Sequence, residues 1–283
     1  MAKGNLLLGT AANSVGDVVM YRREGAQVSR VRVRKVKNPK TNAQSTQRAF
    51  FAPVAKFYSP LAIVLERSFE GLSKAKSYAK FLKTNVDLAR ANDWLLPKGT
   101  GFFPLPYKLS QGSLPSLNYI LDRDEQKLVV DDIALQETDT TIAQLSTAFV
   151  SAGFHAGDIV TFICLQADQI PNIQNCIPYV AQFEIDTTST ALIADALKGI
   201  TLQGGGDIMK VKCASGITCA AAIVVARYQN NVWRRNSQSL SVDSTLMTAI
   251  GNASYKADAI ASYGATNTGD NPLVYLDGEE LNG

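Results

Sequence analysis

The sequence predicts an α+β protein in which a basic N-terminal β-hairpin and helices precede a mainly antiparallel β domain with short helices. Three observations support this fold class. Polar and apolar side chains alternate across residues 30–34, and apolar side chains recur at spacings of three and four across residues 50–89. Short apolar runs bounded by turn residues then follow residue 158, which is typical of antiparallel strands. These later strands could close into a sandwich.

The N-terminal hairpin is predicted from two strand-like segments, Val18–Arg23 and Val28–Val36, with Glu24–Gln27 as the turn between them. Glycines at positions 4, 9 and 16 indicate that the residues before the hairpin form a loop. The second strand is expected to end at Asn38-Pro39, because proline has no backbone N–H to donate to a sheet.

The second strand of this hairpin is the most distinctive feature of the chain. Arg30, Arg32 and Arg34 are two residues apart and would project from one face of an extended strand. The valines between them would occupy the other face, which can be buried. Residues 28–40 contain no carboxylate, so the segment is suited to lie against a negatively charged surface. The candidate nucleic-acid or subunit-interface residues are Arg22, Arg23, Arg30, Arg32, Arg34, Lys35, Lys37, Lys40 and Arg48.

Two helices are expected to follow the hairpin. Thr41 is the expected N-cap of the first, in which Pro53 and Pro60 predict a kink or a division into two shorter helices. The second is expected to begin after Ser73 and to end near Asn92. Its outer face would extend the basic surface through Lys74, Lys76, Lys80 and Lys83.

A connector at residues 93–118 is predicted to separate a basic region, 1–92, from an acidic α+β domain, 119–283. The connector contains four prolines and three glycines, which is typical of a linker or a long packed loop. Its aromatic residues, Phe102, Phe103 and Tyr107, favour a loop docked on a surface.

The domain 119–283 is predicted to mix strands with short helices. Helices are expected at Thr140–Gly153, where a threonine cap precedes apolar residues, and at Ser244–Ser262. Asn230-Asn231 would form a tight turn within a hairpin spanning Ala220–Val242. The strand-like segments are Asp158–Gln166, Tyr179–Asp186, Ile208–Cys213, Cys219–Gln229 and Leu273–Leu276.

Charge is distributed unevenly along the chain. The whole chain has a net charge of +3. Residues 1–100 contain 18 Lys and Arg against 6 Asp and Glu, a net of +12, whereas residues 101–283 contain 10 against 19, a net of −9. A molecule with a basic pole and an acidic pole can bind a polyanion or pack head to tail with its own copies. A chance division of charge between two domains is the alternative.

The sequence does not indicate an enzyme, a metal site or a cofactor. The single histidine, His155, lies in a predicted turn without a nucleophile motif, and Gly204–Gly206 lacks the Lys-Ser/Thr of a phosphate loop. Acidic residues at 122–125 and 131–132 could bind a cation, but a solvated turn is the more usual role. The four cysteines do not form a disulfide scaffold in a chain of this length, and Cys164 and Cys213 are expected to be buried thiols. No apolar run reaches the length of a membrane helix, so no membrane partner is expected.

The basic strand has three interpretations. It could pair with nucleic-acid phosphates, with Tyr21 stacking on a base. It could instead pair with the acidic half of a neighbouring copy. Finally, it could be a solvated edge strand whose charges prevent aggregation.

Two motifs in the first 50 residues match known patterns: VG-x-x-V-x-Y-x-x-x-G across the hairpin, and NPKT-x-AQ-x-x-QR at the start of the first helix. The matching residues are Val15, Gly16, Val19, Tyr21, Gly25, Asn38, Pro39, Lys40, Thr41, Ala43, Gln44, Gln47 and Arg48. With these motifs the chain resembles a group of proteins from Bacteroidota genomes and their bacteriophages. The resemblance implies a phage or prophage setting and a virion structural role, and it implies no known activity.

The leading hypothesis is therefore a bacteriophage virion structural protein: a capsid, capsid-associated or tail component. It would be synthesised in the host cytoplasm and assemble in the virion with copies of itself and other virion proteins, with DNA as a further candidate partner. A protein that binds nucleic acid without sequence specificity outside the particle is the first alternative. A host-encoded protein-interaction module is the second.

Overall fold

The computed structural model of the 283-residue chain describes residues 3–5, 10–15, 17–23, 26–32, 41–168 and 176–264. Contacts within the chain define two compact units, residues 1–39 and residues 40–283. This division differs from the three parts predicted from the sequence. Residues 93–118 belong to the second unit, where Phe102, Phe103 and Tyr107 are buried.

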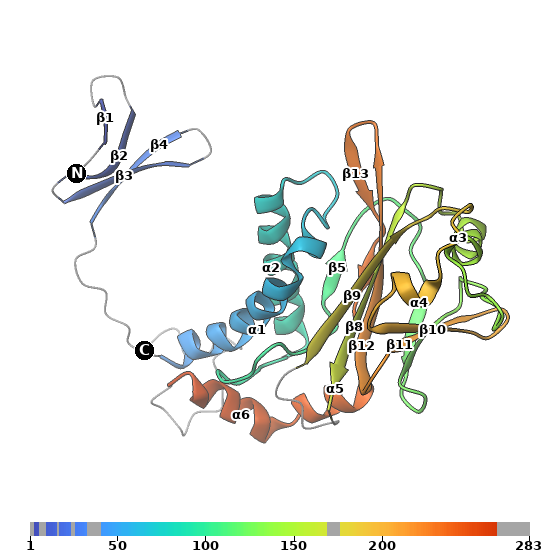
Figure 1. The fold of residues 1–283 in the computed structure, drawn as a ribbon. Helices are drawn as coiled ribbons and strands as arrows, with labels where there is room; N and C mark the ends of the chain where they lie inside the picture. The colour runs from blue at the N-terminus through green and yellow to red at the C-terminus, as the bar shows by residue number, and fades with distance from the viewer. Residues whose placement is uncertain are drawn as a thin grey trace. The chain divides into compact units, whose positions relative to one another are not determined.

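The first unit is an antiparallel sheet of four strands in the order β1-β2-β3-β4 (Figure 1). The strands are β1 (Lys3–Asn5), β2 (Thr10–Val15), β3 (Val18–Arg23) and β4 (Ala26–Val31). Strands β3 and β4 form the predicted hairpin, but β4 begins two residues before the expected Val28, because the pair Arg23–Ala26 extends the ladder. The prediction of a loop before the hairpin was also wrong, because backbone pairing forms β1 and β2 there. The sequence of these two strands has no alternation of apolar and polar residues from which they could be predicted.

The second unit begins with a helical hairpin of α1 (Asn42–Leu65) and α2 (Lys74–Ala91). Thr41 caps α1 as predicted, because its hydroxyl oxygen accepts a hydrogen bond of 3.3 Å from the backbone N–H of Gln44. Helix α1 continues through Pro53 and Pro60 as one helix, so of the two expected alternatives, a kink or a division into two helices, the division did not occur. Burial of one face of the helix offsets the loss of the backbone hydrogen bonds that the two prolines cannot donate.

Helix α1 is the one helix in the described part of the chain that is long and apolar enough to span a membrane by length and composition. Phe57 and Leu61 are fully buried in it, and the helix packs against α2 and α6. The apolar side chains on the buried face of α1 therefore belong to the core of the second unit.

Two larger antiparallel sheets form the rest of the second unit. The first has the order β10-β11-β7-β6, and its strands are β6 (Tyr119–Asp122), β7 (Lys127–Val130), β10 (Ile200–Gly204) and β11 (Met209–Cys213). The second has the order β13-β12-β8-β9, with β15 also paired to β12. Its strands are β8 (Ile159–Ala167), β9 (Ile177–Glu184), β12 (Ile217–Gln229), β13 (Val232–Arg235) and β15 (Ser241–Val242). Strands β5 (Lys108–Ser110) and β14 (Gln238–Ser239) form a separate pair.

The five-stranded sheet separates two hydrophobic cores. Along β12, Ala222 and Val224 face the core that contains α1 and α2, whereas Ile223 and Val225 face the core shared with the four-stranded sheet and α3 (Ile142–Ser151). Helices α1 and α2, the five-stranded sheet and the four-stranded sheet therefore form successive layers (Figure 1). This arrangement confirms the predicted α+β class, with a mainly antiparallel β region after the helices.

Several local predictions for this unit were accurate. The segments expected as strands correspond to β8, β9, β11 and β12, and the tight turn after β12 has Asn230 and Asn231 at φ 53° and 61°. The short helix α4 (Ile193–Ala196) was not predicted. The expected strand Leu273–Leu276 lies outside the described residues.

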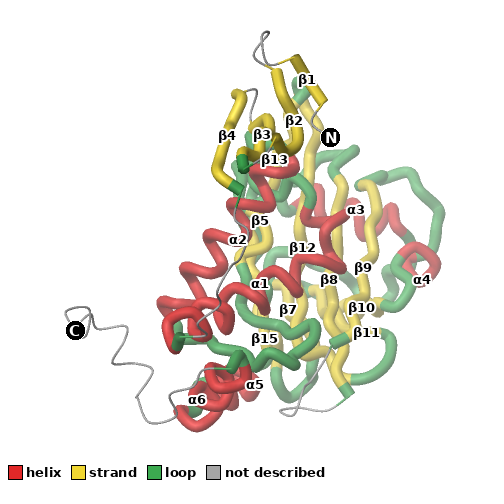
Figure 2. Tube along the Cα trace, turned by 90° about the vertical axis from the view of Figure 1, so that its left-hand side faces the viewer, coloured by secondary structure: helices red, strands yellow, loops and turns green. Residues whose placement is uncertain are grey.

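The helix expected at Ser244–Ser262 is two helices, α5 (Ser244–Ile250) and α6 (Ala253–Ser262). The chain breaks the first helix at Gly251, and Asn252 then caps the second by accepting a hydrogen bond of 3.0 Å from the backbone N–H of Ser254. The two helices lie together near α1 (Figure 2).

Candidate assembly and nucleic-acid interface

The exposed Arg30 of β4 lies on a face of the first unit that also carries an aromatic ring. Strand pairing places Arg30 opposite Val19 and Tyr21 opposite Val28, so these four residues share one face. The guanidinium carbon of Arg30 lies 5.9 Å from the centroid of the Tyr21 ring, within cation–π range. This face thus offers a cation and a π-surface side by side.

The pairing continues one residue beyond β4. The backbone N–H of Arg32 donates a hydrogen bond of 2.5 Å to the carbonyl of Asp17, so Arg32 keeps the alternation and lies exposed on the face of Arg30. Val31 on the opposite face is 73% exposed, so the apolar side of the strand is left uncovered by the described residues of its own unit. β4 is also an edge strand. A charged face, and a strand edge with which no described strand pairs, are therefore available to a partner.

The other predicted interface residues lie in three places. The strand register sets Arg22 across from Gln27 and Arg23 across from Ala26. Arg48 is half-buried on α1. The remaining residues lie outside the described part of the chain, and these are Arg34, Lys35, Lys37 and Lys40.

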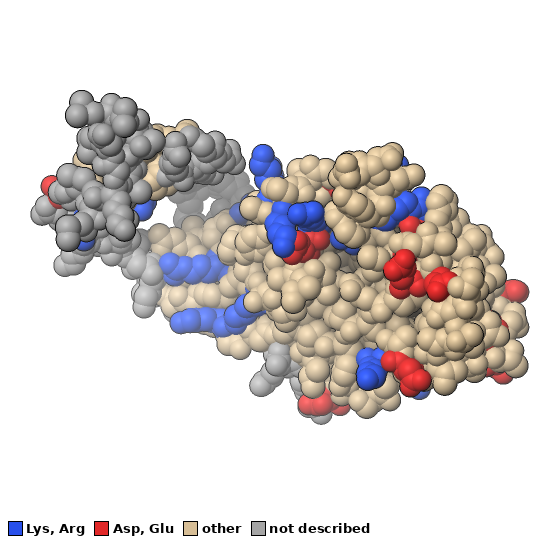
Figure 3. Space-filling view, turned by 45° about the horizontal axis from the view of Figure 1, so that its top comes forward, with Lys and Arg blue, Asp and Glu red and all other residues tan. Residues whose placement is uncertain are grey.

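Helix α2 carries a second basic surface, within the second unit. Lys74, Lys76, Lys80 and Lys83 are exposed on it, as the helical spacing predicted. Lys74 forms an ion pair with Glu66, while the other three have no ion pair among the residues that the structure describes. In the space-filling view of Figure 3, basic side chains occur over the helical part of this unit and acidic ones mostly over its sheets.

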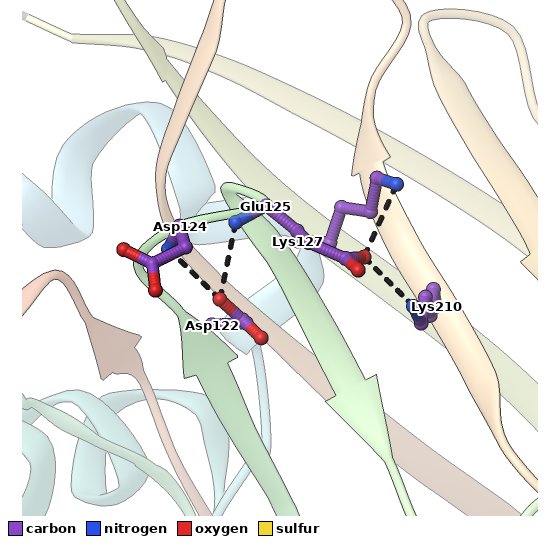
Figure 4. A network of polar contacts seen from close by, with 5 residues as sticks. All are labelled: Asp122, Asp124, Glu125, Lys127 and Lys210. Carbon is purple, nitrogen blue, oxygen red and sulfur yellow. Dashed lines mark hydrogen bonds and ion pairs between the residues drawn. The ribbon is translucent and has the colours of Figure 1, made fainter.

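The acidic residues at the end of β6 form a hydrogen-bonded turn (Figure 4). One carboxylate oxygen of Asp122 accepts hydrogen bonds from the backbone N–H groups of Asp124 and Glu125, at 2.8 and 3.1 Å. Glu125 lies between Lys210 and Lys127, at 2.7 and 3.3 Å, and these hydrogen bonds lower the pKa of its carboxyl group. The described residues contain no group of His, Cys, Asp and Glu that could hold a metal ion.

A groove of about 730 Å³ lies beside the loop that joins α1 to α2, lined in part by Phe69, Glu70, Lys80 and Ser113. The Glu70 carboxylate accepts hydrogen bonds from the backbone N–H and the hydroxyl of Ser113, at 2.8 and 2.9 Å. Partial burial acts to raise the pKa of Glu70, but these hydrogen bonds and one from the backbone of Arg235 outweigh it and lower the pKa. Glu70 is therefore ionised and holds the two loops together, in a role that the sequence analysis missed.

His155 and Gly204 each take part in local backbone structure. The backbone N–H of His155 donates to the carboxylate of Asp158 at 2.9 Å, and its side chain is exposed. Gly204 ends β10 so close to the backbone of Gln136 that a Cβ atom would lie 2.2 Å from it. That close packing explains a glycine there without a phosphate ligand.

Comparison with known proteins gives one match. Residues 10–89 match the model of a family described as a family of unknown function, DUF6266. The matched segment runs from β2 through most of α2, and it contains both basic surfaces. Neither a curated protein nor a solved structure matches the chain.

Proposed function

We propose that this protein is a bacteriophage virion structural protein, a capsid, capsid-associated or tail component, which assembles in many copies through its basic N-terminal region. The observation that supports this most is the small first unit. Among the side chains of this four-stranded sheet that the structure describes, none is fully buried, and Val31 is 73% exposed. Such a unit gains stability when a partner covers it.

The charge distribution favours a second copy as that partner. Residues 1–39 contain 8 Lys and Arg against 2 Asp and Glu, whereas residues 101–283 have a net charge of −9. A basic unit on one copy can therefore approach the acidic β region of the next, which is a head-to-tail contact that can repeat.

The direct test is mass spectrometry of particles purified from a lysate of the host that encodes this chain. We expect peptides of this protein to co-purify with particles through a density gradient, in a constant ratio to the other particle proteins. Its absence from intact particles, together with its presence in the soluble fraction, would contradict the proposal.

A second candidate is a nucleic-acid-binding protein that acts outside the particle. It is favoured by the pair Arg30 and Tyr21, since a guanidinium group can contact a phosphate while an aromatic ring stacks on a base. The exposed lysines of α2 could add phosphate contacts without sequence specificity.

A further inference from the structure

Two buried cysteines lie in contact at the edge of the helical core. The Sγ atoms of Cys176 and Cys219 are 3.5 Å apart, although the residues are 43 positions apart in the chain. Both are free thiols, with exposed fractions of 2% and 0%. No function discussed so far uses them.

A β-bulge directs Cys219 toward its partner. The pairing of β12 with β8 passes from Thr218–Gln166 to Ala220–Leu165, so Cys219 is the extra residue between the two pairs. Its thiol donates a hydrogen bond of 3.2 Å to the carbonyl of Leu165.

Cys176 is placed where its backbone can adjust. It immediately precedes β9 and lies outside the ladder, and its backbone N–H donates a hydrogen bond of 2.9 Å to the carbonyl of Phe102. A disulfide requires the sulfur atoms to approach by roughly 1.5 Å, to a bond length of about 2.05 Å. A residue outside the ladder can make that shift, whereas Cys164 and Cys213 both pair inside strands and are held in place.

We propose that Cys176 and Cys219 are a modification site, at which a peroxide forms an intramolecular disulfide in the folded protein. One sulfur takes an oxygen atom from hydrogen peroxide to give a sulfenic acid and one water. The sulfur of the second thiol then attacks the sulfenic sulfur and forms the S–S bond. The hydroxyl group leaves with the proton of the second thiol as another water, so one peroxide is reduced for each disulfide.

The disulfide would fasten the start of the edge strand β9 to the central strand β12. The reaction is expected to be slow, because a hydrogen bond with Cys176 and burial raise the pKa of the Cys219 thiol and leave little thiolate. The site therefore stays reduced in a reducing cytoplasm and is oxidised on longer exposure outside the cell. This inference does not depend on the proposed function.

The test uses the full-length protein, treated with hydrogen peroxide and digested without reductant for peptide mapping by mass spectrometry. We expect a linked peptide containing Cys176 and Cys219, a loss of two of the four thiols, and a rise in melting temperature that dithiothreitol reverses. The linked peptide should be absent from Cys219→Ser and present in the matched control Cys164→Ser.

A second experiment keeps the test decisive if peroxide enters the folded protein too slowly or if a variant folds poorly. The wild-type protein is unfolded and refolded in a mixture of reduced and oxidised glutathione and then mapped in the same way. The proposal is overturned if neither experiment gives the Cys176–Cys219 peptide, if oxidation stops at sulfinic acid, or if the linkage joins other cysteines or two chains.

Discussion

Arg227 on β12 donates two hydrogen bonds of 2.7 Å to the carboxylate of Asp158, whose side chain is 1% exposed. The Arg227 side chain is 15% exposed, so both side chains of the pair are largely buried. This fork-to-fork pair fastens the turn before β8 to the neighbouring strand, and the same carboxylate accepts the backbone N–H of His155.

Replacing Asp158 by Asn should destabilise the second unit strongly. The change leaves a nearly buried guanidinium without its carboxylate, which we expect to lower the free energy of unfolding by about 3 kcal/mol. Urea unfolding monitored by circular dichroism measures this value. Arg234→Gln on the exposed side of β13 is the control and should change stability little; equal stability of wild type and Asp158→Asn would refute the role of the pair.

Glu70 predicts a pH dependence of stability. Because its pKa is lowered in the folded protein, the unfolded state binds its proton first as pH falls, and the folded state loses that stabilisation as pH drops from about 4.5 through the folded pKa. Glu70→Gln should therefore be less stable than wild type at neutral pH, and the difference should shrink in acid.

Thermal melts of wild type and Glu70→Gln between neutral and acid pH measure this difference. Glu184→Gln, which removes an exposed carboxylate on β9, is the matched control and should not reproduce it. A difference that stays constant across the range would show that the Ser113 contacts do not favour the carboxylate.

Nucleic-acid binding through the basic strand predicts a steep salt dependence. If Arg30, Arg32 and Arg34 each contact a phosphate, the triple change to Gln should weaken binding to a DNA duplex and reduce the slope of log affinity against log salt by about three. Fluorescence anisotropy in a salt series measures both. Arg123→Gln in the exposed turn after β6 is the control, and an unchanged slope in the triple variant would dismiss the DNA alternative.

The exposed edge strand β4 predicts an effect of Val31 on assembly. The change Val31→Lys should hinder pairing or packing with another chain. It should therefore lower the average molar mass of the protein in solution, measured by light scattering at a given concentration. Ile120→Lys places the same charge on β6, an edge strand of the second unit where Ile120 is 66% exposed. An equal decrease of the average molar mass in the two variants would argue against a specific role for the first unit in assembly.

The sequence predicted the features that depend on neighbouring residues. The Thr41 cap, the exposed lysines of α2 and the Asn230-Asn231 turn all follow from local spacing and backbone preference. The prolines of α1 left open a kink or a division of the helix, and burial of one face of α1 accompanies a single helix through both of them.

Contacts between distant segments could not be predicted from one sequence. No feature of the sequence around Glu70 or Ser113 indicates that these two residues are in contact in the fold. The same holds for Cys176 and Cys219. For the basic strand, alternation predicted the exposed Arg30 and Arg32, but it could not reveal that Val31 is uncovered on the other face.

The central claim is that the basic N-terminal region assembles copies of this chain. Size-exclusion chromatography with light scattering, applied to the full-length protein over a range of concentrations, tests it most directly. We predict a mass that rises with concentration, and a mass near that of one 30.5 kDa chain for the Arg30, Arg32 and Arg34 to Gln variant. A wild-type protein that stays monomeric at the highest concentration would contradict the claim.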